Sequence, residues 1–169
     1  MLWLSTMCGL LVFMGCGYNL QGKGKSNLPD NIKRIHVPIF SNNTLEQGIE
    51  IRVTDSIRKV ILNDGRVSLA GGVDTADAVL DGQVMSFRLR TIGFSKKDRA
   101  EEIRLRMVVR VVLRDTIKNK IVFRKVIISD REYQVSSNLG TNQLKKVKAS
   151  ELASDELARE LQGLMIEGF

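Results

Sequence analysis

The sequence IRLRMVVRVVLR, residues 103–114, alternates apolar side chains with a second set that is mostly arginine. Successive side chains of a β-strand point to opposite faces of a sheet, so this pattern predicts a strand with one apolar face. We expect that face to build the core; it consists of Ile103, Leu105, Met107, Val109, Val111 and Leu113. The opposite face carries Val108 and Val112 among the cations Arg104, Arg106, Arg110 and Arg114. A sheet face away from its helices would otherwise meet only water, so we predict that this arginine row is a partner or ligand face.

Four more segments have the pattern of β-strands, at residues 32–40, 67–69, 78–89 and 121–132. The segment 78–89 and the strand at 103–113 are joined by the polar residues 90–102, and we expect them to form a long hairpin. In the first segment, Ile35, Val37 and Ile39 alternate with Arg34, His36 and Pro38. Pro38 cannot donate a backbone hydrogen bond, which indicates a strand edge or end. The last segment follows a turn at 115–120 and contains Phe123, Val126 and Ile128.

Two segments instead repeat apolar residues with the period of an amphipathic helix. The first follows a polar cluster at 41–44 that could cap a helix, and Gly65 comes just after its end. Its apolar stripe consists of Ile49, Val53, Ile57, Val60 and Ile61. The second begins near Thr141 and contains Leu144, Val147, Leu152, Leu157, Leu161 and Met165. The order of elements predicts an α+β fold, with two helices packed on one face of a four- or five-stranded mostly antiparallel sheet. We expect a single such domain at residues 32–169.

The N-terminal residues 1–15 contain no charged side chain and are followed at once by polar, glycine-rich sequence. This apolar run is shorter than the roughly 20 residues that span a bilayer, which favours a signal peptide over a permanent transmembrane anchor. The stretch Phe13-Met14-Gly15-Cys16 resembles a bacterial lipobox. The resemblance implies cleavage before Cys16, a diacylglycerol and an N-acyl chain on that residue, and a lipidated tether at 16–31. The alternative is a signal peptide cut elsewhere, which would leave an idle thiol at Cys16.

Residue types that support catalysis or metal binding are sparse. His36 is the only histidine, and no second histidine or cysteine lies at ligand spacing, so we expect no metal site and no cofactor besides the acyl chains. The sequence contains no Walker loop, no nucleophile elbow and no dinucleotide-binding fingerprint after a strand. The adjacent pairs Glu101-Glu102 and Asp155-Glu156 are expected to face solvent rather than form an acid/base pair. We therefore expect a binding protein and not an enzyme.

The formal net charge of +7 favours an anionic partner. Cations concentrate at two further places, which we predict to be ligand-binding: Lys96, Lys97 and Arg99 at the hairpin tip, and Lys145 and Lys146 entering the last helix. Lysine and arginine both suit phosphate or sugar-acid groups. The alternative is that each is a solvated charge near the end of an element. Few aromatic residues alternate with these cations, so a nucleic-acid partner is not expected.

The order of several motifs resembles the LptE family of lipopolysaccharide-assembly lipoproteins. They are Gly15-Cys16-Gly17-Tyr18-Asn19-Leu20, Leu28-Pro29, the run from Ile35 to Thr44, the run from Ala76 to Gly82, the basic hairpin and the final amphipathic helix. The resemblance implies a lipid-anchored protein on the periplasmic side of the outer membrane. It also implies that the protein plugs an LptD-type β-barrel, assists assembly of that barrel and contacts lipopolysaccharide, whose lipid A phosphates would suit the predicted cations.

A second interpretation keeps the anchor and the fold but changes the partner. The chain would then be a periplasmic scaffold lipoprotein that activates a cell-wall synthase or assists another secretion barrel. Composition does not separate the two interpretations.

Overall fold

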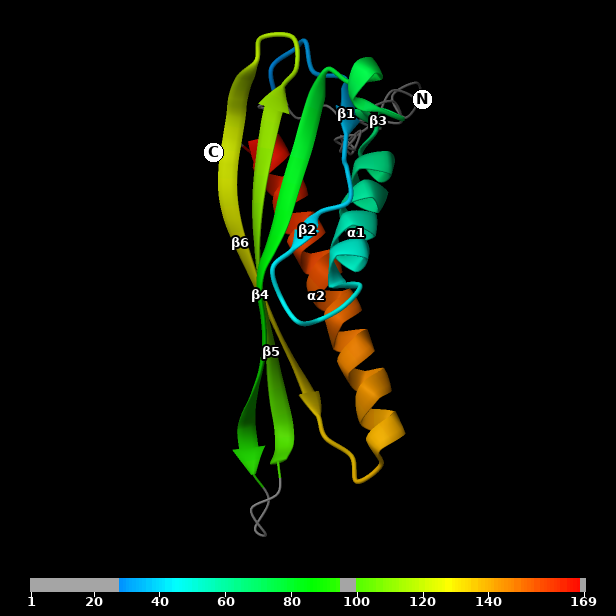
Figure 1. Ribbon diagram of the computed structural model, residues 1–169, viewed down its shortest axis with the longest axis vertical. Helices are drawn as coiled ribbons and strands as arrows, with labels where there is room; N and C mark the ends of the chain where they lie inside the picture. The colour runs from blue at the N-terminus through cyan, green and yellow to red at the C-terminus, as the bar shows by residue number, and fades with distance from the viewer. Residues whose placement is uncertain (1–27, 95–99, 168–169) are drawn as a thin grey trace, which may run out of the picture.

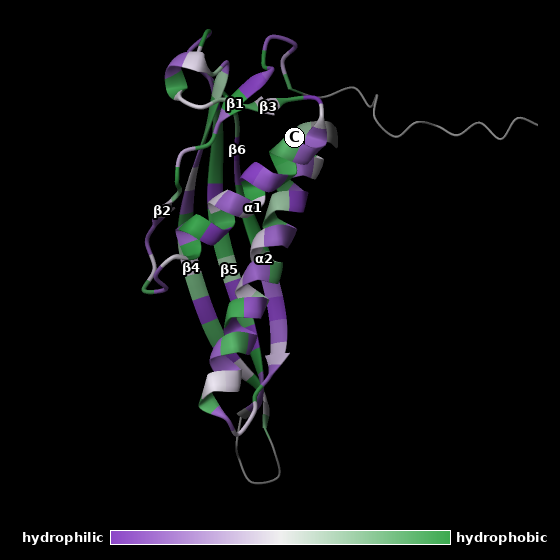
Figure 2. Cartoon of the chain, turned by 90° about the vertical axis from the view of Figure 1, so that its right-hand side faces the viewer, coloured by the Kyte–Doolittle hydropathy of each residue, from purple (hydrophilic) through white to green (hydrophobic). Residues whose placement is uncertain are grey.

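The computed structural model describes residues 28–94 and 100–167 of the chain (Figure 1). Its elements, in order, are β1 (Arg34–His36), β2 (Ser41–Asn42), α1 (Ile49–Asp64), β3 (Ser68–Leu69), a short 3-10 turn (Val73–Thr75), β4 (Ala78–Phe94), β5 (Ala100–Asp115), β6 (Lys120–Gln134) and α2 (Leu139–Glu167). The strands form one six-stranded sheet in the order β3-β1-β4-β5-β6, and β2 also pairs with β4. Both helices lie on the same face of this sheet (Figure 2).

The predicted α+β class with two helices on one face is confirmed, but the sheet has more strands and is mixed. Strands β4, β5 and β6 are antiparallel, whereas β1 is parallel to β3 and β4, and β2 is parallel to β4. The chain leaves β1, passes through α1 and returns as β3. A crossover of this kind makes the two strands parallel. The sequence pattern suggested strands 32–40 and 67–69 without showing this connection.

Strand β5 has the two faces that its alternation predicts. Its residues Leu105, Met107, Val109, Val111 and Leu113 are buried in the core, and Ile103 is half-buried. The core continues into α1, whose predicted stripe is confirmed by the buried Ile49, Val53, Ile57 and Ile61. Helix α1 ends at Gly65, whose φ of 72° is the left-handed conformation expected for glycine at this position.

Three sequence predictions about local structure were wrong. Ile39 does not continue the buried face of the first strand, because β1 already ends at His36: Ile39 is 61% exposed, and Phe40 is buried instead. The cluster at 41–44 does not cap α1, whose N-cap is Gly48. Instead, Thr44 N donates a hydrogen bond to Asn42 Oδ1 at 2.9 Å, so the cluster forms its own turn.

The third error concerns the long helix α2. Leu157, Leu161 and Met165 are buried as predicted, but Leu144 is 72% exposed and Leu152 is also exposed. Small side chains take their place in the middle of the helix, where Ala149, Ser150, Ala153, Ser154 and Ala158 are buried. Such residues let a helix backbone approach its neighbours closely, and α2 packs against both α1 and β6. An apolar pattern that looks only for large residues misses this contact.

The two ends of the long molecule have different character. At one end, which we call the tether end, Asn31 Nδ2 donates to Asp115 Oδ2 at 2.9 Å, so the first described residues lie beside the β5–β6 turn. At the other, the hairpin end, β4 stops at Phe94 and β5 begins at Ala100 (Figure 1). Leu28, near the start of the described chain, is already buried in the core. The long hairpin therefore projects away from the side at which the chain enters the domain.

Candidate functional site

The strongest candidate for a binding surface is the outward face, the face of the sheet that points away from the helices. All of the predicted β5 arginines lie on it and are exposed: Arg104, Arg106, Arg110 and Arg114. Side chains directly opposite one another on antiparallel strands share a face, so the register shows which residues of β4 and β6 surround them. The structure confirms the position of the arginine row, and its binding role stays a prediction.

Two of these arginines are balanced by carboxylates of β6. Arg106 Nη2 lies 2.7 Å from Asp130 Oδ2, and Arg104 Nη2 lies 2.6 Å from Glu132 Oε1. The hydrogen bond from Arg106 holds the pKa of Asp130 below its usual range, and the same bond raises the pKa of Arg106. Because such exposed pairs contribute little to stability, their main effect is to orient the side chains.

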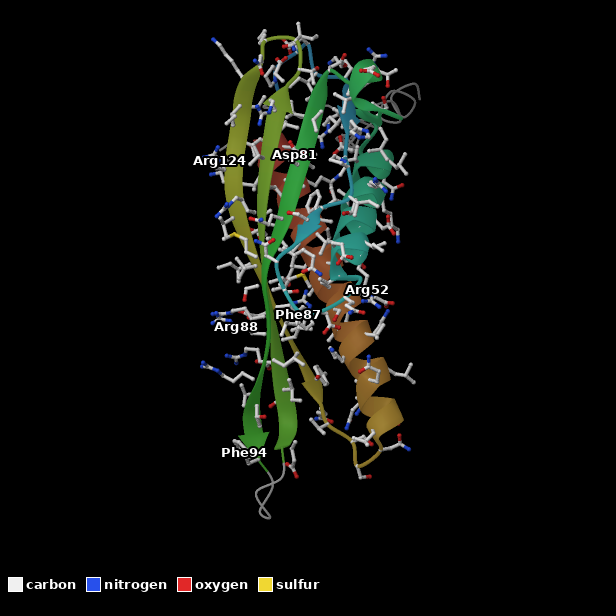
Figure 3. The ribbon with its side chains drawn as sticks, viewed as in Figure 1. Arg52, Asp81, Phe87, Arg88, Phe94 and Arg124 are labelled. Carbon is white, nitrogen blue, oxygen red and sulfur yellow. The ribbon has the colours of Figure 1, made fainter. Side chains whose placement is uncertain are left out.

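Strand β4 adds two arginines that are not paired with a carboxylate. Arg88 lies opposite Arg106, and Arg90 lies opposite Arg104; we call these four residues the arginine block. Among the described residues, neither Arg88 nor Arg90 has an ion-pair or hydrogen-bond partner, and Figure 3 shows Arg88 on the side of the sheet opposite Phe87. Like charges directly opposite one another destabilise a sheet. The block is therefore suited to bind an anion, because guanidinium groups can hold phosphate or carboxylate groups bidentately.

Arg88 and Arg90 were not predicted as site residues, although the sequence contains a signal for them. The triplet Arg-Leu-Arg occurs at 88–90 and again at 104–106. In a hairpin, two such triplets face each other if the register aligns them, and here it does. The irregularity between Val84 and Ser86 helps set that register, and it could not be located from the sequence alone.

Apolar side chains lie among the cations farther along the outward face. Val108 lies opposite Ile128, and Arg110 lies opposite Val126; Ile128 is 52% exposed and Val126 is 53% exposed. These two residues of β6 were predicted only as strand residues, and the structure shows that they do not share the buried face of Phe123. A surface that mixes exposed aliphatic groups with guanidinium groups is suited to an amphipathic anion.

The cations that enter α2 have separate environments. Lys146 Nζ lies 2.6 Å from Glu46 Oε2 and 5.8 Å from the centre of the Phe87 ring, so it links α2 to the β2–α1 loop and to β4. Lys145 Nζ donates to the carbonyl oxygen of Gln134 at 2.9 Å and lines a shallow groove with Tyr133 and Leu152. Burial, together with the charge of Glu46, raises the pKa of Tyr133. The charge of Lys146 is therefore balanced by a carboxylate, whereas Lys145 contacts a backbone carbonyl oxygen and has no ion-pair partner among the described residues.

Several predicted features lie outside the described residues. They are the hairpin-tip cations Lys96, Lys97 and Arg99, the lipidation site Cys16, the signal peptide 1–15 and most of the tether. Beside the tip, Phe94 is exposed at the end of β4. His36 is half-buried, and its Nδ1 lies 3.2 Å from the carbonyl oxygen of Ala70, which indicates a structural role.

Within residues 28–94 and 100–167, no helix is both long and apolar enough to cross a membrane. In the same part of the chain, no group of three or more His, Cys, Asp or Glu side chains could hold a metal ion.

Solved structures share this fold at low sequence identity. A protein from Xanthomonas campestris has a TM-score of 0.59 and 14% identity, over 80% of this chain and 84% of its own. A minor lipoprotein from Acinetobacter baumannii has a TM-score of 0.52 and 18% identity, over 82% and 94%. An uncharacterised lipoprotein B from Nitrosomonas europaea has a TM-score of 0.53 and 14% identity, over 84% and 89%. At such identities these likenesses show the fold alone.

Comparison by sequence gives the family directly. The chain matches none of the curated proteins. The family model described as LptE, lipopolysaccharide-assembly, matches residues 32–166, which is nearly the whole domain. That match agrees with the resemblance carried by the motifs at 15–44 and 76–82 and with the observed fold. The chain therefore belongs to the LptE family.

Proposed function

We propose that this protein is an outer-membrane lipoprotein, acylated at Cys16 and held on the periplasmic side, that plugs an LptD-type barrel. In this role it assists assembly of the barrel and contacts lipopolysaccharide on its way to the outer leaflet. No catalytic step is assigned to it. The anchor would place the tether end at the membrane, and the hairpin would extend from there into the barrel.

The observation that carries the proposal is the outward face of the β4–β5–β6 sheet. Lipopolysaccharide presents phosphates and acyl chains together, and the outward face presents Arg110 and Arg114 together with the exposed Val126 and Ile128. Among the described residues, neither of these arginines has an ion-pair partner. Lipid phosphates could therefore replace solvent around them without breaking contacts inside the protein.

Two further contacts with lipopolysaccharide are proposed on charge. The predicted cations Lys96, Lys97 and Arg99 belong to the segment that joins β4 to β5, and Lys145 lines the groove beside Tyr133. Both would supply point charges or guanidinium groups to phosphate. Lys146, which was predicted with Lys145, is assigned here to the ion pair with Glu46.

Purification of the tagged protein from detergent-solubilised envelopes of its native host tests the partner. A large outer-membrane barrel in stoichiometric amount is the expected result. A cell-wall synthase in its place would support the scaffold alternative and contradict the plug. A parallel preparation of the Cys16→Ala variant tests the anchor, because several acyl chains provide the membrane attachment. The variant should lack the acyl chains, and any association with the outer membrane that remains should depend on the barrel.

A further inference from the structure

The lower part of strand β4 has an open edge. On one side β4 pairs with β5 along its whole length, as far as Phe94 opposite Ala100. On the other side, β1 pairs only with Ala78 and Val79, and β2 only with Gln83 and Val84. The last backbone contact there is from Asn43 N to Val84 O at 2.9 Å. Within the described chain, no strand pairs with this side of residues 85–94.

The figures agree with this pairing. Below the β2–α1 loop, no other strand runs beside the outer edge of β4 in Figure 1 or Figure 2. Side chains of that loop, Asn43 to Glu46, and of Met85 to Leu89 line a shallow groove at the upper end of the open edge. An edge of this kind presents unpaired N–H and C=O groups, which are a template for one more strand.

The arginine block indicates which chemistry the added strand would carry. Two rows cross the sheet here, Arg88–Arg106–Asp130 and Arg90–Arg104–Glu132. In each row, the carboxylate of β6 balances the arginine of β5, while the arginine of β4 has none. An added strand at the open edge would lie next to β4 as β6 lies next to β5, so its side chains could balance the β4 arginines as the β6 carboxylates balance the β5 arginines. Carboxylates at alternate positions of that strand would face Arg88 and Arg90, because opposed residues share a face.

The other face of the same segment favours apolar residues between those carboxylates. Phe87 packs against the core from this face, and Leu89 is 42% exposed beside it. An added strand would place its intervening side chains next to these two residues, where aliphatic groups would cover exposed apolar surface.

We propose that residues 85–94 of β4 accept an extended segment of a partner protein, with acidic residues at alternate positions and apolar residues between them, as an additional strand of the sheet. The proposal concerns the protein partner and rests on the open edge and the side chains of β4 beside it, so it does not depend on lipopolysaccharide binding. A lipid phosphate could neutralise Arg88 and Arg90 but would leave the backbone groups of the edge unpaired. Hydrogen exchange distinguishes these two cases, because only an added strand pairs with the backbone N–H groups of the edge.

The probe is a synthetic peptide of the pattern Thr-Val-Asp-Val-Glu-Val-Thr, titrated into the full-length mature protein. Hydrogen exchange is measured along the chain with and without the peptide. We expect slower exchange within residues 85–94 and no change along β6. The double variant Arg88→Glu, Arg90→Glu should bind this peptide at least about tenfold more weakly than the wild type does. A second peptide, with lysines in place of the two acidic residues, should bind the double variant more tightly than it binds the wild type.

The matched control is the double variant Lys120→Glu, Arg124→Glu, which makes the same change of charge at exposed residues of β6, away from the open edge of β4. Its affinity should stay within about twofold of the wild type. Circular dichroism checks that both variants fold, and Arg88→Gln with Arg90→Gln replaces the first if it does not.

Three results would each overturn the proposal. A peptide N-methylated at its edge-facing amides that binds as well as the parent would show an anion site without strand addition. Protection along β6 would show that the other edge of the sheet is used. No binding of the parent peptide at all would show that the edge does not accept a strand and that Arg88 and Arg90 only prevent unwanted pairing there.

Discussion

The ring of Phe40 lies over Gly82, and any Cβ at that position of β4 would overlap it. Phe40 is buried, so its ring has little space to rotate into, and its backbone N–H donates to Thr54 Oγ1 at 3.0 Å, which fixes its backbone against α1. We predict that Gly82→Ala lowers the free energy of unfolding by about 1–3 kcal/mol, the usual cost of overpacking a core. Urea denaturation measures this. Gly71→Ala is the control, since a Cβ there meets no atom within 4 Å; equal effects of the two changes would contradict the prediction.

The carboxylate of Asp115 should make the free energy of unfolding depend on pH. The backbone N–H of Lys118 and the side-chain amide of Asn31 donate to its carboxylate at 2.8 and 2.9 Å and hold its pKa below the usual range; the N–H of Ile117 adds to them. The pKa of Asp115 is lower in the folded protein than in the unfolded chain, where it is about 3.9. The ionised carboxylate therefore stabilises the fold at pH values above about 3.9, and this contribution is lost as the pH falls through the pKa of the folded state. Asp115→Asn should therefore be less stable than the wild type at neutral pH, and the difference should shrink in acid. Thermal denaturation across this range measures it, and a constant difference would sink the idea.

Individual residues also show where sequence reasoning succeeds. The two faces of 103–114 could be predicted because alternation is a local property of a strand. The contact between Phe40 and Gly82 could not, because it depends on how β4 packs against a segment far away in the chain. The same limit hid Arg88 and Arg90, whose significance comes from their cross-strand neighbours Arg106 and Arg104.

At the scale of elements, the ion pair between Lys146 and Glu46 connects α2 with the β2–α1 loop. Both side chains are about one-fifth exposed, at 21% and 22%. Lys146→Met keeps the aliphatic stem over Phe87 but leaves Glu46 without its partner, so we expect a loss of about 1 kcal/mol in the free energy of unfolding. The double variant with Glu46→Gln should recover part of it. Lipopolysaccharide binding by Lys146→Met should be unchanged, and a loss of binding at full stability would place Lys146 in the site after all.

Lys145, on the same helix, is expected to affect ligand binding and not stability. Lys145→Glu should leave the free energy of unfolding within about 0.5 kcal/mol, as expected for a surface change, and should weaken binding of purified lipopolysaccharide. Fluorescence titration at low salt measures the affinity. Unchanged affinity in the folded variant would remove the groove beside Tyr133 from the proposed binding surface.

Helices and strands themselves were largely predictable, and their connections were not. The stripe of α1 and the long hairpin are visible in the residue period, since each is set by neighbours a few positions away. The mixed sheet arises from the crossover through α1, and the middle of α2 packs through alanine and serine. Neither feature leaves a strong local pattern in the sequence.

For the whole molecule, the decisive feature is that the tether end and the hairpin end lie apart along the long axis (Figure 1). With 17 residues in β4, at roughly 3.3 Å per residue, the hairpin is long enough to carry charge far from a membrane anchor at the opposite end. The formal charge of +7 does not by itself indicate where an anionic ligand binds. The fold separates the cations of the hairpin from those of the tether end, which makes their roles testable independently.

Because the two ends lie apart, the charge of the hairpin tip can be changed without altering the tether end. Changing Lys96, Lys97 and Arg99 together to Glu should weaken lipopolysaccharide binding by at least about tenfold at low salt, with a smaller effect at high salt because ions screen exposed charges. We expect the fold to stay intact, because substitutions of surface charges usually change stability little. The control changes Lys59, Lys118 and Lys120 to Glu, which alters the net charge equally on α1 and at the tether end. If both triple variants bind equally weakly, net charge alone governs binding; if the tip variant folds and binds like the wild type, the hairpin end is not a lipopolysaccharide site. Only a selective loss at the tip would support the orientation in which the anchored protein presents its hairpin to the transported lipid.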